Sequence, residues 1–169
     1  MKARVVAVTL GAALALAVLP AASAGATAGT TDRALLAQVR QATAQFHDLQ
    51  TATDAGYQQF LPCFDDGVAS GMGQHFAMLP LDETIDPLHP EVLVYEPHND
   101  GYKLVALEYV VPQNEDKWTG DEPPMLFDEH FHTNDVLGIW ALHAWIWRGN
   151  PGGVHDDFSP NVRMCPTAS

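Results

Sequence analysis

The stretch that most constrains the fold is 139–147, IWALHAWIW, in which β-branched and aromatic residues follow one another almost without interruption. It ends at 148–153, RGNPGG, a dense cluster of turn-forming residues. A short apolar run bounded by a turn favours a buried strand over a helix. Strand alternation then places His143 on the same face as Trp145 and Trp147. Because burial of an unpaired imidazole is costly, His143 must have a partner, and that partner is the functional question.

Glu108 poses the same problem in a second apolar run, 102–111, YKLVALEYVV, which also predicts a strand. A carboxylate in the middle of a buried strand has to be paired with a cation, held neutral or bound to a metal ion. Two structural alternatives stay open at this point. Either Glu108 lies on an edge strand and faces water, or it forms an ion pair with Lys103, Arg148 or Arg163.

A further histidine lies in the glycine-rich stretch 71–78, GMGQHFAM. Glycines flank Met72 on both sides, so the backbone there can turn tightly and approach another group closely. The spacing of Met72, His75 and Met78 combines thioether and imidazole donors, a set that suits copper(I). The alternative is that both methionines fill gaps in the core.

His130 and His132 form a histidine pair in the acidic segment 125–132. On a strand, residues two positions apart point to the same face, where two imidazoles can chelate a metal ion. An exposed pair in a loop is an equally good interpretation of the same residues.

Our first functional hypothesis is a site for one transition metal ion, zinc, copper or iron. Two imidazoles and one carboxylate are a familiar ligand set for these ions. We expect His75, Glu108 and His143 to supply them, with His130 or His132 as a fourth ligand.

The second hypothesis is a module that binds a small apolar ligand in a pocket lined by Trp140, Trp145 and Trp147, with His143 and Glu108 orienting the ligand. The third is a structural or interaction protein in which the buried histidines and glutamate form a hydrogen-bond network. The sequence has no G-x-S-x-G elbow, no phosphate-binding loop and no H-E-x-x-H motif, so the common hydrolase and nucleotide-binding signatures do not apply.

The first 24 residues are predicted to be a signal peptide. Residues 1–4 are basic at two positions, 5–19 are apolar, and 20–24, PAASA, end in the small-x-small pattern of a cleavage site. The apolar part has about 15 residues, whereas a membrane-spanning helix needs about 20. We therefore expect a secreted protein without a membrane span. Residues 25–30 are small and polar and are predicted to be disordered, and 31–169 are expected to form a single domain.

The chain is strongly acidic, with 8 basic and 21 acidic residues. Loss of Lys2 and Arg4 with the signal peptide leaves 6 basic against 21 acidic residues, a net charge of −15. Such a surface repels nucleic acid and anionic membranes and favours cations or basic partners, although plain solubility explains it equally well. The sequence does not define an oligomeric state.

The two cysteines, Cys63 and Cys165, are expected to form a disulfide in an oxidising compartment. It would close a loop of about 100 residues and, in the loop-entropy treatment, stabilise the fold by at most ~4.7 kcal/mol. Metal ligation by both thiols is the alternative, but the two residues lack the close spacing of thiolate sites.

The predicted fold class is α+β, with an N-terminal amphipathic helix packed on an antiparallel β-sheet that is either open or closed into a barrel. Apolar residues three and four apart predict the helix, which begins near Thr31 and ends at Gly56. Strands are expected at 91–96, 103–111 and 139–147, with shorter ones near 73–78 and 125–131. The predicted core comprises Leu36, Val39, Phe46, Leu93, Val105, Leu107, Leu142 and Ile146.

Four segments together resemble a family of exported bacterial proteins whose activity is not established. They are GMGQHF at 71–76, PEVLVYEP at 90–97, LVALEYVV at 104–111 and LHAWIWRGNPGG at 142–153. The resemblance covers most of the mature chain. This sequence departs from the family pattern at Met78, where an asparagine is usual, and at 158–159, where a tryptophan–asparagine pair is usual. The resemblance implies that His75, Glu108 and His143 are the polar members of otherwise apolar motifs.

Overall fold

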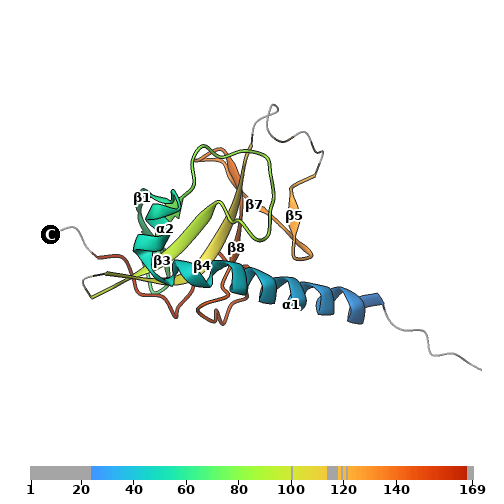
Figure 1. Ribbon diagram of the computed structural model, residues 1–169, viewed down its shortest axis with the longest axis horizontal. Helices are drawn as coiled ribbons and strands as arrows, with labels where there is room; N and C mark the ends of the chain where they lie inside the picture. The colour runs from blue at the N-terminus through green and yellow to red at the C-terminus, as the bar shows by residue number, and fades with distance from the viewer. Residues whose placement is uncertain (1–23, 100, 114–117, 119, 121, 167–169) are drawn as a thin grey trace, which may run out of the picture.

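The structure is a computed structural model that describes residues 24–99, 101–113, 118, 120 and 122–166. It has the predicted α+β class, with an N-terminal helical segment and a curled six-stranded antiparallel sheet (Figure 1). The strand order is β1-β2-β3-β4-β8-β7. Within the described ranges β1 and β7 pair with one neighbour each, so the sheet curls without closing into a barrel. Residues 1–23 of the predicted signal peptide lie outside the described residues.

The helical segment consists of α1 (Ala24–Thr43), the 3-10 turn η1 (Ala44–His47) and α2 (Leu49–Asp54). It breaks between η1 and α2 because Asp48 is extended and its carboxylate accepts a hydrogen bond from the Gln50 backbone, which starts a new helix. The segment ends at Gly56, whose φ of +108° suits glycine. At its other end α1 includes residues 25–30, which were expected to be disordered.

The sheet contains the three long strands and the short strand near 73–78 that were expected, together with two edge strands that were not. Its members are β1 (Gln58–Asp65), β2 (Gly71–Ala77), β3 (Val92–His98), β4 (Gly101–Pro112), β7 (His132–Asn134) and β8 (Ile139–Ala144). A separate small hairpin joins β5 (Met125–Leu126) to β6 (Glu129–His130). The edge strands escaped prediction because β1 contains Pro62 and two glutamines, and β7 has three exposed polar residues.

One face of the sheet carries the main core and is covered by the helical segment (Figure 1). Val39 of α1 and Phe46 of η1 are buried in this core. All predicted core residues are buried except Leu36, which is half-buried and packs against this core. Val105 belongs to a smaller core on the opposite face. Over the residues that the structure describes, no helix is long and apolar enough to cross a membrane.

A β-bulge in β4 decides which face Glu108 occupies. Val94 pairs with Ala106, but the next residue, Tyr95, pairs with Leu104, so Val105 is an extra residue in β4. Leu104 and Leu107 both pack in the main core although they are three positions apart. The bulge therefore shifts the alternation by one residue and turns Glu108 to the opposite face.

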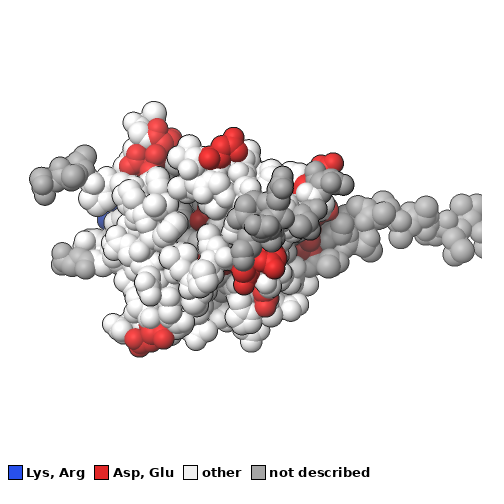
Figure 2. All heavy atoms as spheres, turned by 90° about the horizontal axis from the view of Figure 1, so that it is seen from above, with Lys and Arg blue, Asp and Glu red and all other residues white. Residues whose placement is uncertain are grey.

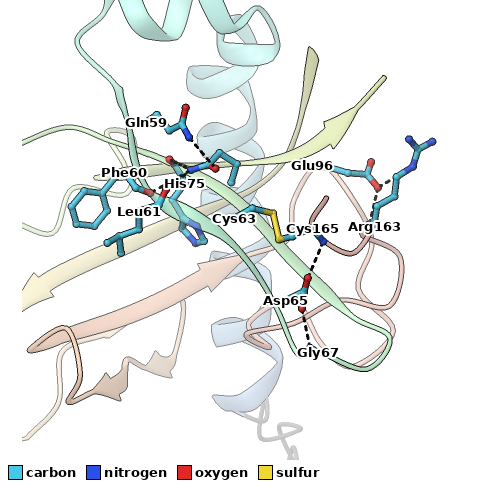
Figure 3. The surroundings of a disulfide bond; sticks show 11 residues. Gln59, Phe60, Leu61, Cys63, Asp65, Gly67, His75, Glu96, Arg163 and Cys165 are labelled. Carbon is cyan, nitrogen blue, oxygen red and sulfur yellow. Dashed lines mark hydrogen bonds and ion pairs between the residues drawn. A yellow bond between two sulfur atoms is a disulfide. The ribbon is translucent and has the colours of Figure 1, made fainter. Parts of the chain in front are cut away.

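The C-terminal segment is fastened to β1 by the predicted disulfide. Cys63 and Cys165 are joined, with their Cα atoms 5.7 Å apart, and the Cys165 amide donates to the Asp65 carboxylate at 2.9 Å (Figure 3). Glu96 lies near this junction and is almost fully buried. Its carboxylate accepts hydrogen bonds from Nη2 of Arg148 at 2.6 Å and from the backbone amide of Arg163 at 2.9 Å. The disulfide indicates an oxidising, non-cytoplasmic compartment.

Candidate metal centre

His75, Glu108 and His143 come from three different strands and point to the same face of the sheet. Glu108 on β4 lies directly opposite His143 on β8. His75 on β2 is separated from β4 by β3, where its partner in the register is Val94. One donor atom from each residue lies within 4.8 Å of the other two.

The curl of the sheet explains how His75 reaches Glu108 across an intervening strand. Two strands that flank a third are about 10 Å apart at the backbone, further than the donor atoms are. On the concave face of a curled sheet, long side chains converge, and β3 contributes only valines between them, Val92 and Val94. The three polar side chains therefore meet above small apolar residues.

The Glu108 carboxylate lies between the two imidazoles. Its Oε2 is 3.5 Å from Nε2 of His75, and its Oε1 is 3.7 Å from Nε2 of His143. Both separations exceed a good hydrogen bond. All three residues are buried, with exposed fractions of 5% for His75, 8% for Glu108 and 2% for His143.

No Lys or Arg among the described residues pairs with Glu108. The basic residues considered for this role are placed elsewhere: Arg148 and Arg163 both contact Glu96, and Lys103 is exposed opposite Glu96 in the strand register. Glu108 is also not on an edge strand, because β4 is flanked by β3 and β8. Its neighbours are two imidazoles, and together with them the carboxylate forms a donor set that could hold a metal ion.

The ring nitrogens of the two histidines are the second observation that favours a ligand. Within the described part of the chain, Nδ1 of His75 and both ring nitrogens of His143 are buried without a hydrogen-bond partner. A buried polar atom without a partner costs about 1–3 kcal/mol. A metal ion held by the two Nε2 atoms would use one of these three nitrogens, Nε2 of His143, and would leave Nδ1 of His75 as it is.

Asp157 stands behind His143 and was not identified from the sequence. Its Oδ1 lies 3.5 Å from Nδ1 of His143 and 3.0 Å from Nδ1 of His132. A carboxylate facing the second nitrogen of a histidine is the usual support of a metal-binding imidazole, since it favours the tautomer with a free Nε2. Asp157 lies in an irregular segment after a turn, where no periodic pattern marks it.

The electrostatics of the two imidazoles differ. Burial lowers the pKa of His75, so this ring is neutral and able to bind a metal at neutral pH. Burial also lowers the pKa of His143, but the carboxylates of Glu108 and Asp157 outweigh it and raise that pKa overall. The interaction with His143 in turn lowers the pKa of Asp157 to about 2. Metal binding at His143 would therefore displace a proton.

His130 and His132 do not form the expected chelate. They belong to different sheets, β6 and β7, with the buried Phe131 between them. His130 is exposed on the small hairpin. His132 reaches the cluster only indirectly, through Asp157. The break between the two short strands cancels the alternation on which the prediction depended.

A cavity of about 430 Å³ lies on the concave face beside the cluster. His75, Glu108 and His143 form part of its lining. Residues of β1 and of β7, at opposite ends of the strand order, also line it, which shows how far the sheet curls.

The expected tryptophan-lined pocket is not this cavity. Trp140, Trp145 and Trp147, all within the described residues, lie outside its lining. Trp140 and Trp147 pack against the main core on the other face, and Trp145 stacks on the His143 ring with the centroids 6.0 Å apart. Trp147 leaves the predicted face because β8 ends at Ala144 and strand alternation ends with it.

The methionines of the glycine-rich stretch are also separated. Met72 lines the cavity, whereas Met78 is exposed and lies against Gly56. A copper site built from both thioethers is therefore not formed. The glycines have the expected role, because a Cβ atom on Gly73 would lie 2.6 Å from the Tyr95 carbonyl oxygen.

We compared the chain with protein-family models, with curated proteins and with solved structures, and none of the three comparisons found a match. The interpretation of the site therefore rests on its geometry. Three buried donors from three strands meet at the edge of an apolar cavity, and a second carboxylate supports one of them.

Proposed function

We propose that this protein binds one transition metal ion through Nε2 of His75, the carboxylate of Glu108 and Nε2 of His143. The observation that carries the proposal is the meeting of these three buried donor atoms within 4.8 Å, with no Lys or Arg among the described residues to neutralise the carboxylate. We infer that it does so after export, which the disulfide supports.

The donor set suits zinc, copper or non-haem iron. These ions bind imidazole nitrogen and carboxylate oxygen at about 2.0–2.2 Å, so two donors on one ion are at most about 4.2–4.4 Å apart. The nitrogen–oxygen separations of 3.5 and 3.7 Å, each to a different oxygen of Glu108, fall below that limit. The three donors together lie within 4.8 Å of one another, so the side chains would have to close slightly around an ion. Three protein ligands leave at least one coordination position open, as in catalytic zinc sites.

The test is the metal content of the exported protein, purified without a His-tag and measured by inductively coupled plasma mass spectrometry. We expect close to one zinc, copper or iron per chain in the wild type. His143→Ala and Glu108→Ala should each reduce it at least ten-fold, because each removes a ligand. His130→Ala is the matched control and should keep the metal, since His130 is exposed and does not line the cavity beside the cluster.

Two further measurements keep the result interpretable. Circular dichroism of each variant separates loss of metal from loss of fold. Addition of zinc, copper or iron should raise the melting temperature of the metal-free wild type but not that of His143→Ala, by mass action on the folded state. A wild type that contains no metal and shows no thermal shift with any of the three ions would disprove the proposal.

A further inference from the structure

We infer that the cavity beside the metal centre binds a small carboxylic acid with an apolar body, whose carboxylate completes the coordination of the ion. This inference rests on the proposed metal site and adds the class of ligand. The volume of the cavity, about 430 Å³, falls in the range of small-molecule pockets, which is about 300–1,000 Å³.

The walls of the cavity are apolar. Phe60, Leu61 and Phe64 of β1 line one side, and Val110 of β4 and Ile139 of β8 contribute from the sheet. The Phe64 ring also packs edge-on against the His75 imidazole, with the centroids 5.5 Å apart. Such walls favour an alkyl or aryl group over a polar one.

The mouth of the cavity is apolar as well. Val136 and Leu137, in the turn between β7 and β8, line it and are 94% and 40% exposed. Large apolar side chains exposed beside a cavity mark an interaction site more often than isolated ones do. The apolar surface therefore continues from the cavity wall to the outside.

The polar atoms available to a ligand are concentrated at the cluster. The polar lining residues of β7 make hydrogen bonds of their own: Thr133 donates to Asp135 and accepts from Gln113, Oδ1 of Asn134 accepts from the Leu137 amide, and Nδ1 of His132 contacts Asp157. A ligand in this cavity thus meets apolar walls along its body and metal-binding groups at one end. That asymmetry selects an amphiphile in one orientation.

The net charge of the metal centre favours a ligand whose polar end is anionic. A divalent ion with the single charge of Glu108 leaves one net positive charge beside apolar walls, where an unneutralised charge is costly. Asp157 would not bind the ion itself: its Oδ1 lies behind the ring, 3.5 Å from Nδ1 of His143, and its side chain is 46% exposed, so water screens its charge more than that of Glu108. A monoanionic carboxylate neutralises the centre, and carboxylate oxygen is a good ligand for zinc. An alcohol would leave the net positive charge of the metal centre unneutralised, and an ammonium group would increase it.

Isothermal titration calorimetry tests the inference in two stages, zinc first and then the acid. Octanoate is the probe. Acetate is the comparison compound that has the carboxylate but no alkyl chain, and 1-octanol is the one that has the alkyl chain but no charge. We expect zinc-loaded wild type to bind octanoate at least ten-fold more tightly than either comparison compound. Without zinc, octanoate binding should weaken at least ten-fold.

A variant with two substitutions at the mouth of the cavity tests whether octanoate binds there. Val136→Asp combined with Leu137→Asp should weaken octanoate binding at least five-fold, because it places acidic groups where the anion enters, and it should leave zinc binding intact. Val68→Asp is the matched control, since Val68 is 84% exposed and does not line the cavity. It should bind octanoate like the wild type.

The two stages separate failure of the inference from failure of the metal site. Absence of zinc binding in the first stage would overturn the proposed function and this inference with it. If zinc binds but octanoate binds no better than 1-octanol, the carboxylate does not use the ion and the inference is wrong. Equal octanoate binding by the mouth variant and the wild type would likewise overturn it, because the acid would then lie outside the cavity.

Discussion

Glu91 is a half-buried acid outside the metal centre, and it should make the stability of the protein depend on pH. Burial raises its pKa from the ordinary 4.5 to about 7, although the carboxylate accepts a hydrogen bond from the Val110 amide. Below pH 4.5 Glu91 is protonated in the folded and unfolded states alike. As pH rises from 4.5 to 7 only the unfolded state ionises, so stability falls across this window and stays lower above it.

Glu91→Gln should remove this fall. Relative to wild type, the variant should gain about 1–3 kcal/mol in unfolding free energy between pH 4.5 and pH 8. Urea denaturation at several pH values measures the difference. The exposed Glu129→Gln is the control and should show no comparable trend. A Glu91→Gln difference that is constant over the whole range would contradict the assignment.

Single residues of the site were predictable where they broke an apolar pattern. His75, Glu108 and His143 stood out because each is a polar residue within a run of buried ones, and the structure brings all three together. Asp157 could not be found in this way, because it follows a turn in a polar segment and reaches His143 only through tertiary packing. The tryptophans were misleading because aromatic content says nothing about which face of the sheet carries the cavity.

At the scale of elements, the close contact between β2 and β3 depends on Gly73. Its φ is +119°, and a Cβ atom there would meet the Tyr95 carbonyl oxygen at 2.6 Å. Gly73→Ala should therefore lower the unfolding free energy by about 2–4 kcal/mol, through backbone strain together with the steric clash.

The control for Gly73→Ala separates backbone strain from the clash. Gly67 also has a positive φ, +71°, but nothing lies within 4 Å of its added Cβ. Gly67→Ala should cost only about 1 kcal/mol. Because Gly73 precedes His75 by two residues, its variant should also weaken metal binding. Equal destabilisation by both substitutions in urea denaturation would show that the close contact is unimportant.

The long strands were predictable, but the bulge and the short edge strands were not. Apolar runs marked β3, β4 and β8, and the glycine at position 56 marked the end of the helical segment. The bulge at Val105 left no recognisable sign in the sequence, yet it sets the face on which Glu108 lies. Short polar edge strands such as β7 form because a neighbour provides hydrogen bonds, which a local pattern does not record.

At the scale of the whole molecule, the disulfide indicates a non-cytoplasmic protein, and the surface is acidic. The Cys63–Cys165 bond joins β1 to the C-terminal segment across 102 residues. Acidic side chains are spread over the face shown in Figure 2, and basic ones are scarcely visible there. Such a surface raises the local concentration of cations, which would assist metal capture but does not define the site.

The most direct test of the metal centre is anomalous scattering from crystals grown with zinc, recorded on both sides of the zinc absorption edge. We expect one strong peak about 2.0–2.2 Å from Nε2 of His75, Nε2 of His143 and a carboxylate oxygen of Glu108. Peaks confined to exposed histidines such as His89 and His130, with none among the three buried donors, would contradict the account.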